Sequence, residues 1–392
     1  MARRKALFFI TLAAAVGLPG LYARLAHLSW SPQATALLAG AGIMGASFLL
    51  LWACDAAQSD IPQTLALAVV ALVAVLPEYA VSMYFTWSAG KNPAGGYAQY
   101  AIANMTGANR LLIGVAWGAV AVIYWLKTRQ PVHLDPERRL ELRFLALATL
   151  YAFVIPLKGT LAWYDGVVFL GIYVWYMASA GRRPVEESEA EGPARVILAL
   201  PRPARRAVTA ALFLYSALVI VANAAPFSEA LVATGRLLHI NEFLLVQWLA
   251  PIASETPEFV VALMFALRLR ASLGLGSLLS SKVNQWTLLV GMMPGCFALA
   301  TGHLTAILPM GAHQMNEILL TAAQSLLAVV VLADLRLSLL DGLVLFVLFT
   351  AQLLSPGEWH RAYALIYVAL AVGWVLARPA RLRNLWPGKK GS

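Results

Sequence analysis

Charged residues are scarce in this chain. Aspartate, glutamate, lysine and arginine make up 12% of its 392 residues, whereas hydrophobic residues make up 60%. A soluble globular protein has about 25% charged and about 45–50% apolar residues. The scarcity excludes a disordered chain, a nucleic-acid-binding module and most soluble enzymes, because one aqueous core cannot hide so much apolar surface. The class that remains is a protein that crosses a membrane several times.

Cysteine and the usual catalytic motifs are also nearly missing. The two cysteines, Cys54 and Cys296, lie in apolar runs, so no disulfide framework is indicated. The six histidines form no H-E-x-x-H motif, and the sequence has no G-x-S-x-G or P-loop. We therefore expect neither an enzyme nor a resident cofactor, and no nucleic-acid partner.

Long apolar runs take the place of these features. A helix needs about 20 apolar residues to cross the ~30 Å hydrocarbon core of a bilayer, and the alternation expected of a membrane barrel is absent. We predict an all-α integral membrane protein with about twelve transmembrane helices. Their expected ranges are 6–26, 33–57, 61–89, 97–126, 138–156, 160–179, 204–233, 242–268, 271–301, 314–334, 337–354 and 360–378.

The distribution of basic residues tests this count, because cytoplasmic loops carry an excess of Lys and Arg. With the N-terminus in the cytoplasm, 22 basic residues fall in cytoplasmic segments and 5 in outside segments. This predicts a multi-pass protein of the cell (inner) membrane with both termini cytoplasmic. The net charge of +10 then belongs to loops beside the lipid bilayer rather than to an acidic partner. The oligomeric state stays open.

Three markers recur in the same order in both halves of the chain. They are the pairs Pro77-Glu78 and Pro257-Glu258, the small and polar segments 103–109 and 276–284, and Asp-Gly pairs at 165 and 341. From the glutamate to the aspartate is 87 residues in the first half and 83 in the second. A repeat with five helices inverts its second copy, and inverted repeats with interrupted helices are typical of secondary transporters.

This repeat defines the expected organisation of the chain. Two inverted five-helix repeats are joined by a charged cytoplasmic linker. One extra transmembrane helix lies at each end, and a basic tail follows the second of these helices. The expected bounds are 1–30 for the extra N-terminal helix, 31–180 for the first repeat, 181–206 for the linker, 207–355 for the second repeat, and 356–392 for the extra C-terminal helix and tail.

Glu78 and Glu258 are the residues expected to bind an ion. Each is surrounded by apolar residues, and a carboxylate at mid-membrane depth costs roughly 2.5–3.5 kcal/mol unless it faces a cavity, a partner or a cation. Pro77 and Pro257, just before them, remove a backbone donor and kink the helix, which frees carbonyl oxygens as ligands. The pattern predicts a cation site at the membrane midplane, where the two repeats meet.

These motifs resemble those of the sodium/calcium exchanger superfamily, the cation/calcium antiporters. That family has a G-T-S-x-P-E element in the second helix of each repeat and a G-N-x-x-G-S-N element in the third. The resemblance implies cation binding by Glu78 and Glu258, with Glu255, Ser254, Asn104, Ser281 and Gln285 as further ligands. Glu78 and Glu258 would be the metal-binding pair.

The chain departs from the family pattern at several positions. Hydroxyl residues are missing at 73–75, and the ligand position of the first third helix is Leu112. Arg110 and Lys282 are basic where the family is neutral. They modulate the charge of the site if they face it, or they point away and snorkel; the sequence leaves both open. Calcium needs six to eight oxygen ligands, several of them charged, so these departures affect the choice of ion.

We therefore predict a secondary active cation antiporter that binds inorganic cations and works by alternating access. Calcium, sodium or protons are the expected ions. The alternatives are a proton-coupled monovalent cation exchanger and a non-transporting receptor or scaffold that keeps the exchanger fold. The remaining polar residues have ordinary explanations: Asp165, Asp341 and Glu317 are expected near helix starts, and His303 and His313 in an outside loop.

Overall fold

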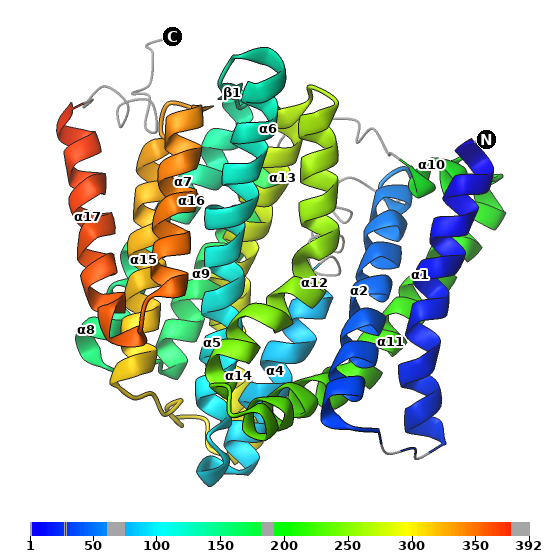
Figure 1. Cartoon of the computed structure of the whole chain (residues 1–392), viewed down its shortest axis with the longest axis horizontal. Helices are drawn as coiled ribbons and strands as arrows, with labels where there is room; N and C mark the ends of the chain where they lie inside the picture. Colours follow the sequence, from blue (N-terminus) through cyan, green and yellow to red (C-terminus); the bar gives the residue numbers. More distant parts are fainter. Residues whose placement is uncertain (1, 27, 29, 61–74, 182–191, 378–392) are drawn as a thin grey trace. The chain divides into compact units, whose positions relative to one another are not determined.

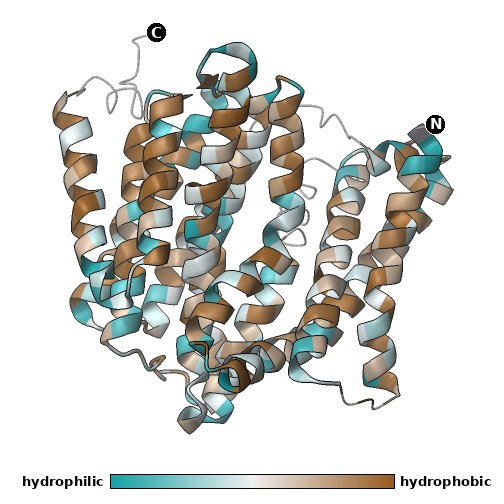
Figure 2. Cartoon of the chain, viewed as in Figure 1, coloured by the Kyte–Doolittle hydropathy of each residue, from teal (hydrophilic) through white to brown (hydrophobic). Residues whose placement is uncertain are grey.

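The computed structural model describes residues 2–26, 28, 30–60, 75–181 and 192–377. They form two units, Met1–Phe85 with Met177–Pro257 and Thr86–Tyr176 with Glu258–Ser392. Both units are built from helices, and these are largely apolar along their length (Figure 1, Figure 2). The expected helix over 61–74, residues 182–191 of the expected linker and the basic tail over 378–392 lie outside the described residues.

The first unit is a group of long helices. Its elements are α1 (Ala2–Leu25), α2 (Pro32–Ala57), the beginning of α4 (Leu76–Lys91), the end of α9 (Trp163–Ala180), α10 (Pro193–Leu198), α11 (Arg202–Leu238) and the first part of α12 (Glu242–Leu267). Helix α2 packs closely on its neighbours because it carries glycines. A Cβ at Gly40 would lie 2.7 Å from the Phe227 ring of α11, and one at Gly45 would lie 2.6 Å from the Ala13 carbonyl of α1.

The second unit contains most of the remaining helices. They are η1 (Pro93–Gly95), α5 (Tyr97–Leu111), η2 (Leu112–Trp117), α6 (Gly118–Thr128), η3 (Pro136–Arg138), α7 (Arg139–Ala152), α8 (Val154–Lys158), α13 (Ala271–Asn284), η4 (Gln285–Leu289), α14 (Val290–Thr301), α15 (Ala312–Val331), α16 (Leu339–Leu354), η5 (Gly357–Trp359) and α17 (His360–Ala377). Helices α5, α13 and α15 are almost wholly buried and form the core of this unit.

Two short backbone pairings join loops at the ends of the second unit. Strand β1 (Val132–His133) pairs antiparallel with β2 (Arg336–Leu337), with Val132 opposite Leu337. An isolated bridge joins Leu161 to Leu308. Each pairing ties a loop of the first half of the chain to a loop of the second half.

Eight helices of the described part are long and apolar enough to cross a membrane. They are 3–25, 32–57, 97–128, 136–158, 202–238, 242–267, 312–331 and 357–377, and α16 is a shorter apolar helix. Large side chains such as Leu37, Leu214 and Leu376 are exposed on them, as expected of helices in contact with lipid. The prediction of a helical, multi-pass membrane protein is confirmed at this level, while the count of twelve crossings stays a prediction.

One helix boundary differs from the expectation. Pro77-Glu78 was expected inside a helix over 61–89, but α4 begins at Leu76, and Glu78 lies in its first turn. Proline is well suited to the first turn of a helix, where its missing N–H is not needed. The helix dipole there favours a carboxylate. Pro257 and Glu258, in contrast, lie within the continuous helix α12.

Candidate functional site

The third helix of each expected repeat ends in the same unusual way. Helix α5 passes at Leu112 into the π-helical turn η2, and α13 passes at Gln285 into the π-helical turn η4. Such turns are rare, leave backbone groups out of the regular ladder and are frequent at functional sites. In η2, Gly114 permits close packing against α16. A Cβ at Gly114 would lie 2.2 Å from the Phe349 ring.

Lys282 of α13 lies against α5. Its side chain is fully buried, and Nζ donates to the Asn109 side-chain oxygen at 2.7 Å and to the Asn109 carbonyl at 3.2 Å. The ammonium also lies over the Trp286 ring, 4.8 Å from its centroid. Lys282 therefore does not snorkel: its charge is held inside the unit by two neutral oxygens and an aromatic face.

Arg110 is neutralised differently. Its side chain is fully buried, forms an ion pair with Glu317 of α15, and bonds through Nε to the Thr106 carbonyl at 3.4 Å. A buried guanidinium needs a carboxylate partner because its desolvation is costly. Glu317 was expected to be a helix-start carboxylate, and that assignment was wrong, since its charge compensates Arg110.

The carboxylates of the predicted cation site lie on α4 and α12. Glu78 is buried in the first turn of α4, and Glu255 is buried on α12. Glu258 is half-buried, one turn after Glu255 on the same helix. Ser254 is buried and its hydroxyl bonds to the Ala250 and Pro251 carbonyls, each at 3.3 Å. Glu255 is thus better shielded from water than Glu258.

Three further predicted ligands lie in the buried core of the second unit. Asn104 is buried in α5, and Ser281 is buried in α13. Gln285 is fully buried at the start of η4, and neither polar atom of its side chain has a hydrogen-bond partner among the described residues. An orphaned buried amide is costly, and a cation is one partner that would satisfy its oxygen.

The predicted ligands divide between the two units. Glu78, Ser254 and Glu255 belong to the first, and Glu258, Asn104, Ser281 and Gln285 belong to the second. Within the described part of the chain, no three His, Cys, Asp or Glu side chains gather as a metal site would. A cation site built from these residues therefore stays a prediction.

The comparisons with known proteins identify the family. The family described as sodium/calcium exchanger protein matches residues 32–180 and 208–355. The chain belongs to this family. Among solved structures, the exchanger is similar to one titled H+/Ca2+ Exchanger CAX. The two are 42% identical over 98% of this chain and 97% of that one, with a TM-score of 0.93.

More distant structures share the fold of the exchanger. YfkE matches at 15% identity over 94% of this chain and 99% of its own, with a TM-score of 0.63. The sodium-calcium exchanger NCX_Mj matches at 18% identity over 88% and 99%, with a TM-score of 0.53. No curated protein matches the chain. The exchanger is a cation/calcium antiporter rather than an enzyme, as the sequence predicted.

The polar network around Glu317 was missed by the sequence analysis. His313 was expected in an outside loop but lies in the first turn of α15, with Nε2 4.0 Å from the Glu317 carboxylate. His360, at the start of α17, binds the same carboxylate oxygen. The spacing of His313 and Glu317, four residues apart on one helix face, was the available signal. Nothing in the sequence links either residue to Arg110 or His360.

The other two acidic residues behave as expected. Asp341 forms a capping box with Ser338 at the start of α16. Asp165 lies in the first turn of α9, where it accepts from the Ala162 backbone N–H at 2.7 Å, and it also binds Lys158. Both carboxylates complete helix N-termini.

Proposed function

We propose that the exchanger moves calcium across the membrane in exchange for protons, by alternating access. The observation that carries this proposal is the 42% identity, over nearly the full length of both chains, to a structure titled as an H+/Ca2+ exchanger. Buried glutamates suit this coupling, because a carboxylate binds either a calcium ion or a proton.

Glu78 and Glu258 are the central ligands of the proposed site, and Glu255, Ser254, Asn104, Ser281 and Gln285 complete it. Calcium takes six to eight oxygen ligands, several of them charged, and this predicted set contains three carboxylates and several neutral oxygens. The orphaned Gln285 amide supports this assignment from the second unit. The proline at 257, inside α12, adds a carbonyl that has lost its helical donor.

Several features support the proposed inverted repeat. The family matches the chain in two stretches, 32–180 and 208–355, and each of the two units takes residues from both. The motif register makes Asn109 and Lys282 equivalent, and these two residues contact each other. Equivalent positions meet in this way at a pseudo-two-fold axis. The two π-helical turns follow at matching places.

Contacts between loops support the proposed topology. Asp60 binds Arg205 in the first unit, and Asp135 accepts from Ser272 at 2.6 Å in the second. The two strands join loops near 132 and 337, and the Leu161–Leu308 bridge joins two others. Each contact links segments that the twelve-helix topology assigns to one side of the membrane. All but the last of these contacts would be cytoplasmic.

Lys282 supports the second candidate function, a proton-coupled monovalent cation exchanger. Glu317 forms an ion pair with Arg110, whereas Lys282, also fully buried, donates to the side-chain oxygen and the carbonyl of Asn109. A fixed positive charge near the site would favour a cation of lower charge.

Purified exchanger in liposomes tests both functions. With a proton gradient imposed, we expect calcium uptake and an opposing proton flux in the parent, and none with Glu78→Gln or Glu258→Gln. Each substitution removes the charge at little steric cost. Glu255→Gln is expected to be milder. Glu358→Gln, which alters an exposed glutamate of η5, is the matched control. Normal uptake by both central variants would reject the site, and potassium or sodium flux without calcium flux would favour the second candidate.

A further inference from the structure

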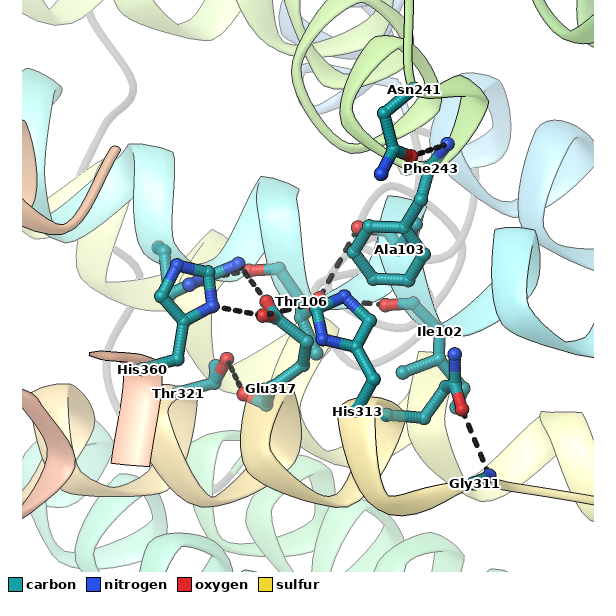
Figure 3. A network of polar contacts seen from close by, with 12 residues as sticks. Ile102, Ala103, Thr106, Asn241, Phe243, Gly311, His313, Glu317, Thr321 and His360 are labelled. Atoms are coloured by element: carbon teal, nitrogen blue, oxygen red, sulfur yellow. Dashed lines mark hydrogen bonds and ion pairs between the residues drawn. The ribbon is translucent and has the colours of Figure 1, made fainter. Parts of the chain in front are cut away.

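Four side chains from three helices of the second unit form a buried polar cluster. Glu317 of α15 pairs through one carboxylate oxygen with Arg110 of α5 and through the other with His360 of α17. His313, one turn before Glu317, lies 4.0 Å from the oxygen that His360 binds. Figure 3 shows His360 and His313 on either side of Glu317. We name these four residues the Glu317 cluster.

Exposure falls steeply across the Glu317 cluster. The His313 side chain is 42% exposed, His360 is 5% exposed, and Glu317 and Arg110 are fully buried. The two imidazole rings are stacked, with centroids 6.3 Å apart. A proton arriving from water at the N-terminal end of α15 therefore meets the exposed His313 before the buried His360.

The charge of the Glu317 cluster depends on its histidines. Arginine stays protonated at all accessible pH values, and with neutral imidazoles its charge is cancelled by the Glu317 carboxylate. Histidine is the side chain that changes charge between about pH 5 and 8. Each proton taken up by His313 or His360 thus adds a positive charge beside Arg110 and Glu317.

We propose that the Glu317 cluster is a second proton-binding site, distinct from the cation site, through which acid on the side of the α15 N-terminus slows cation transport. This inference rests on the proposed function. It assigns a role to His313, His360 and Glu317, which no step of the exchange itself requires. Arg110 is the positioning residue that joins the cluster to α5.

Neighbours in the sequence and one side-chain contact lead from the Glu317 cluster toward the predicted ligands. Arg110 adjoins Asn109, and Asn109 accepts two hydrogen bonds from Lys282. Asn104 lies on the same helix as Arg110, and Ser281 and Gln285 lie one and three residues from Lys282. Added positive charge at the cluster disfavours a second cation at these ligands, and low dielectric in the buried core strengthens the effect.

The helices around the Glu317 cluster also bring other titratable groups. Helix α17 also brings Tyr363, which bonds with Ser355 at 2.9 Å, and Tyr367, which is buried near Arg110. Helices α7 and α8, which also pack on α15, bring Tyr151 and Lys158, and both of these bind Asp165. Helix α16 brings Asp341, which caps its own helix. Histidine is the residue type in the Glu317 cluster whose charge changes between about pH 5 and 8.

Calcium uptake by reconstituted exchanger, measured between about pH 5.5 and 8, tests the inference. We expect the ratio of uptake at the alkaline end to uptake at the acidic end to fall about fivefold in the double variant His313→Gln/His360→Gln, the lower range of coupling between two sites. Each single variant is expected to lie between the parent and the double variant. His303→Gln, an exposed histidine of the loop before α15, is the matched control and should follow the parent.

A second measurement separates the two proposals. The unfolding temperature of the detergent-purified protein is followed over the same pH range, and we expect its pH dependence to weaken in the double variant. A parent that transports calcium, with a double variant of unchanged pH profile, overturns the second proton site and leaves the proposed function standing. A parent that moves no cation overturns the proposed function. Identical unfolding profiles for parent and double variant would then overturn the cluster's role as well.

Discussion

Arg110 and Lys282 are two fully buried cations on corresponding helices, and the protein neutralises them in opposite ways. Arg110 has a carboxylate, Glu317, whereas Lys282 has two neutral oxygens of Asn109 and the face of Trp286. The planar guanidinium suits pairing with a carboxylate, and the compact ammonium is satisfied by separate acceptors. The first arrangement pairs two opposite charges, and the second holds an ammonium against two neutral oxygens and an aromatic face.

Among the substitutions that test this comparison, breaking the Arg110–Glu317 pair is expected to lower the stability of the protein most. Arg110→Met leaves the Glu317 carboxylate buried without its main counter-charge, which should destabilise the protein by about 3–5 kcal/mol. The double variant Arg110→Met/Glu317→Leu replaces the pair with apolar side chains and should recover most of that loss. Thermal unfolding in detergent measures both. Equal destabilisation by the single and double variants would contradict the charge-pair account.

Removing Lys282 is expected to cost less. Lys282→Met leaves two acceptors of Asn109 without this donor, a loss of about 1–3 kcal/mol. The unfolding temperature should therefore fall less than with Arg110→Met. If the order were reversed, Lys282 would be compensating a carboxylate.

The charge of Lys282 also allows a functional prediction. Lys282→Asn removes the positive charge and restores the residue type found at Asn109, so calcium should bind more tightly and with a weaker dependence on pH. Isothermal titration of calcium into parent and variant measures the change. Unaltered affinity and an unaltered pH profile would remove Lys282 from the mechanism and favour an ordinary calcium or sodium exchanger.

The comparison of α5 with α13 extends to the first residues of the π-helical turns that follow them, which differ in polarity. Gln285 opens η4, and Leu112 opens η2. Gln285→Leu removes a buried amide that has no partner in the described part of the chain, so stability should hold or rise. If Gln285 is a cation ligand, calcium affinity should fall about tenfold, the worth of roughly one such contact. Leu112→Gln is the reciprocal control, and lower stability with unchanged affinity in Gln285→Leu would make the amide structural.

Much of the fold was predictable because the bilayer constrains the sequence so strongly. Apolar runs of about 20 residues define membrane helices, and the expected ranges agree with α1, α2, α11 and α12 within a few residues. The start of α4 at Leu76 was not predicted, because hydropathy does not distinguish a proline that begins a helix from one that kinks it.

The candidate site was predictable only in part. Acidic residues in apolar surroundings pointed to Glu78 and Glu258, since such residues are costly in a membrane, and the family resemblance pointed to Gln285. The partners of Arg110 were not predictable, because Glu317 lies 207 residues away in the sequence and the pair depends on the packing of α5 against α15. Whether a partner compensates a buried basic residue can therefore be determined only from the structure, even where the basic residue itself is conspicuous in the sequence.

The smallest effect is expected for an ion pair at the end of a helix, which contrasts with the buried Arg110–Glu317 pair. Arg205 of α11 binds Asp60, just beyond α2, through two nitrogens at 2.5 and 2.8 Å. These hydrogen bonds lower the pKa of Asp60 from 3.8 to about 2. A carboxyl with a lowered pKa stabilises the folded state at pH values above the pKa that it has in the unfolded chain, and this contribution is lost as the pH falls toward 2.

In Arg205→Gln the unfolding temperature should therefore be slightly lower at neutral pH, and the difference from the parent should disappear below about pH 3. Arg206→Gln, which removes a more exposed neighbour 3.4 Å from the same carboxylate, should change it less. A difference that persisted at pH 2 would mean that Arg205 acts through packing rather than through charge.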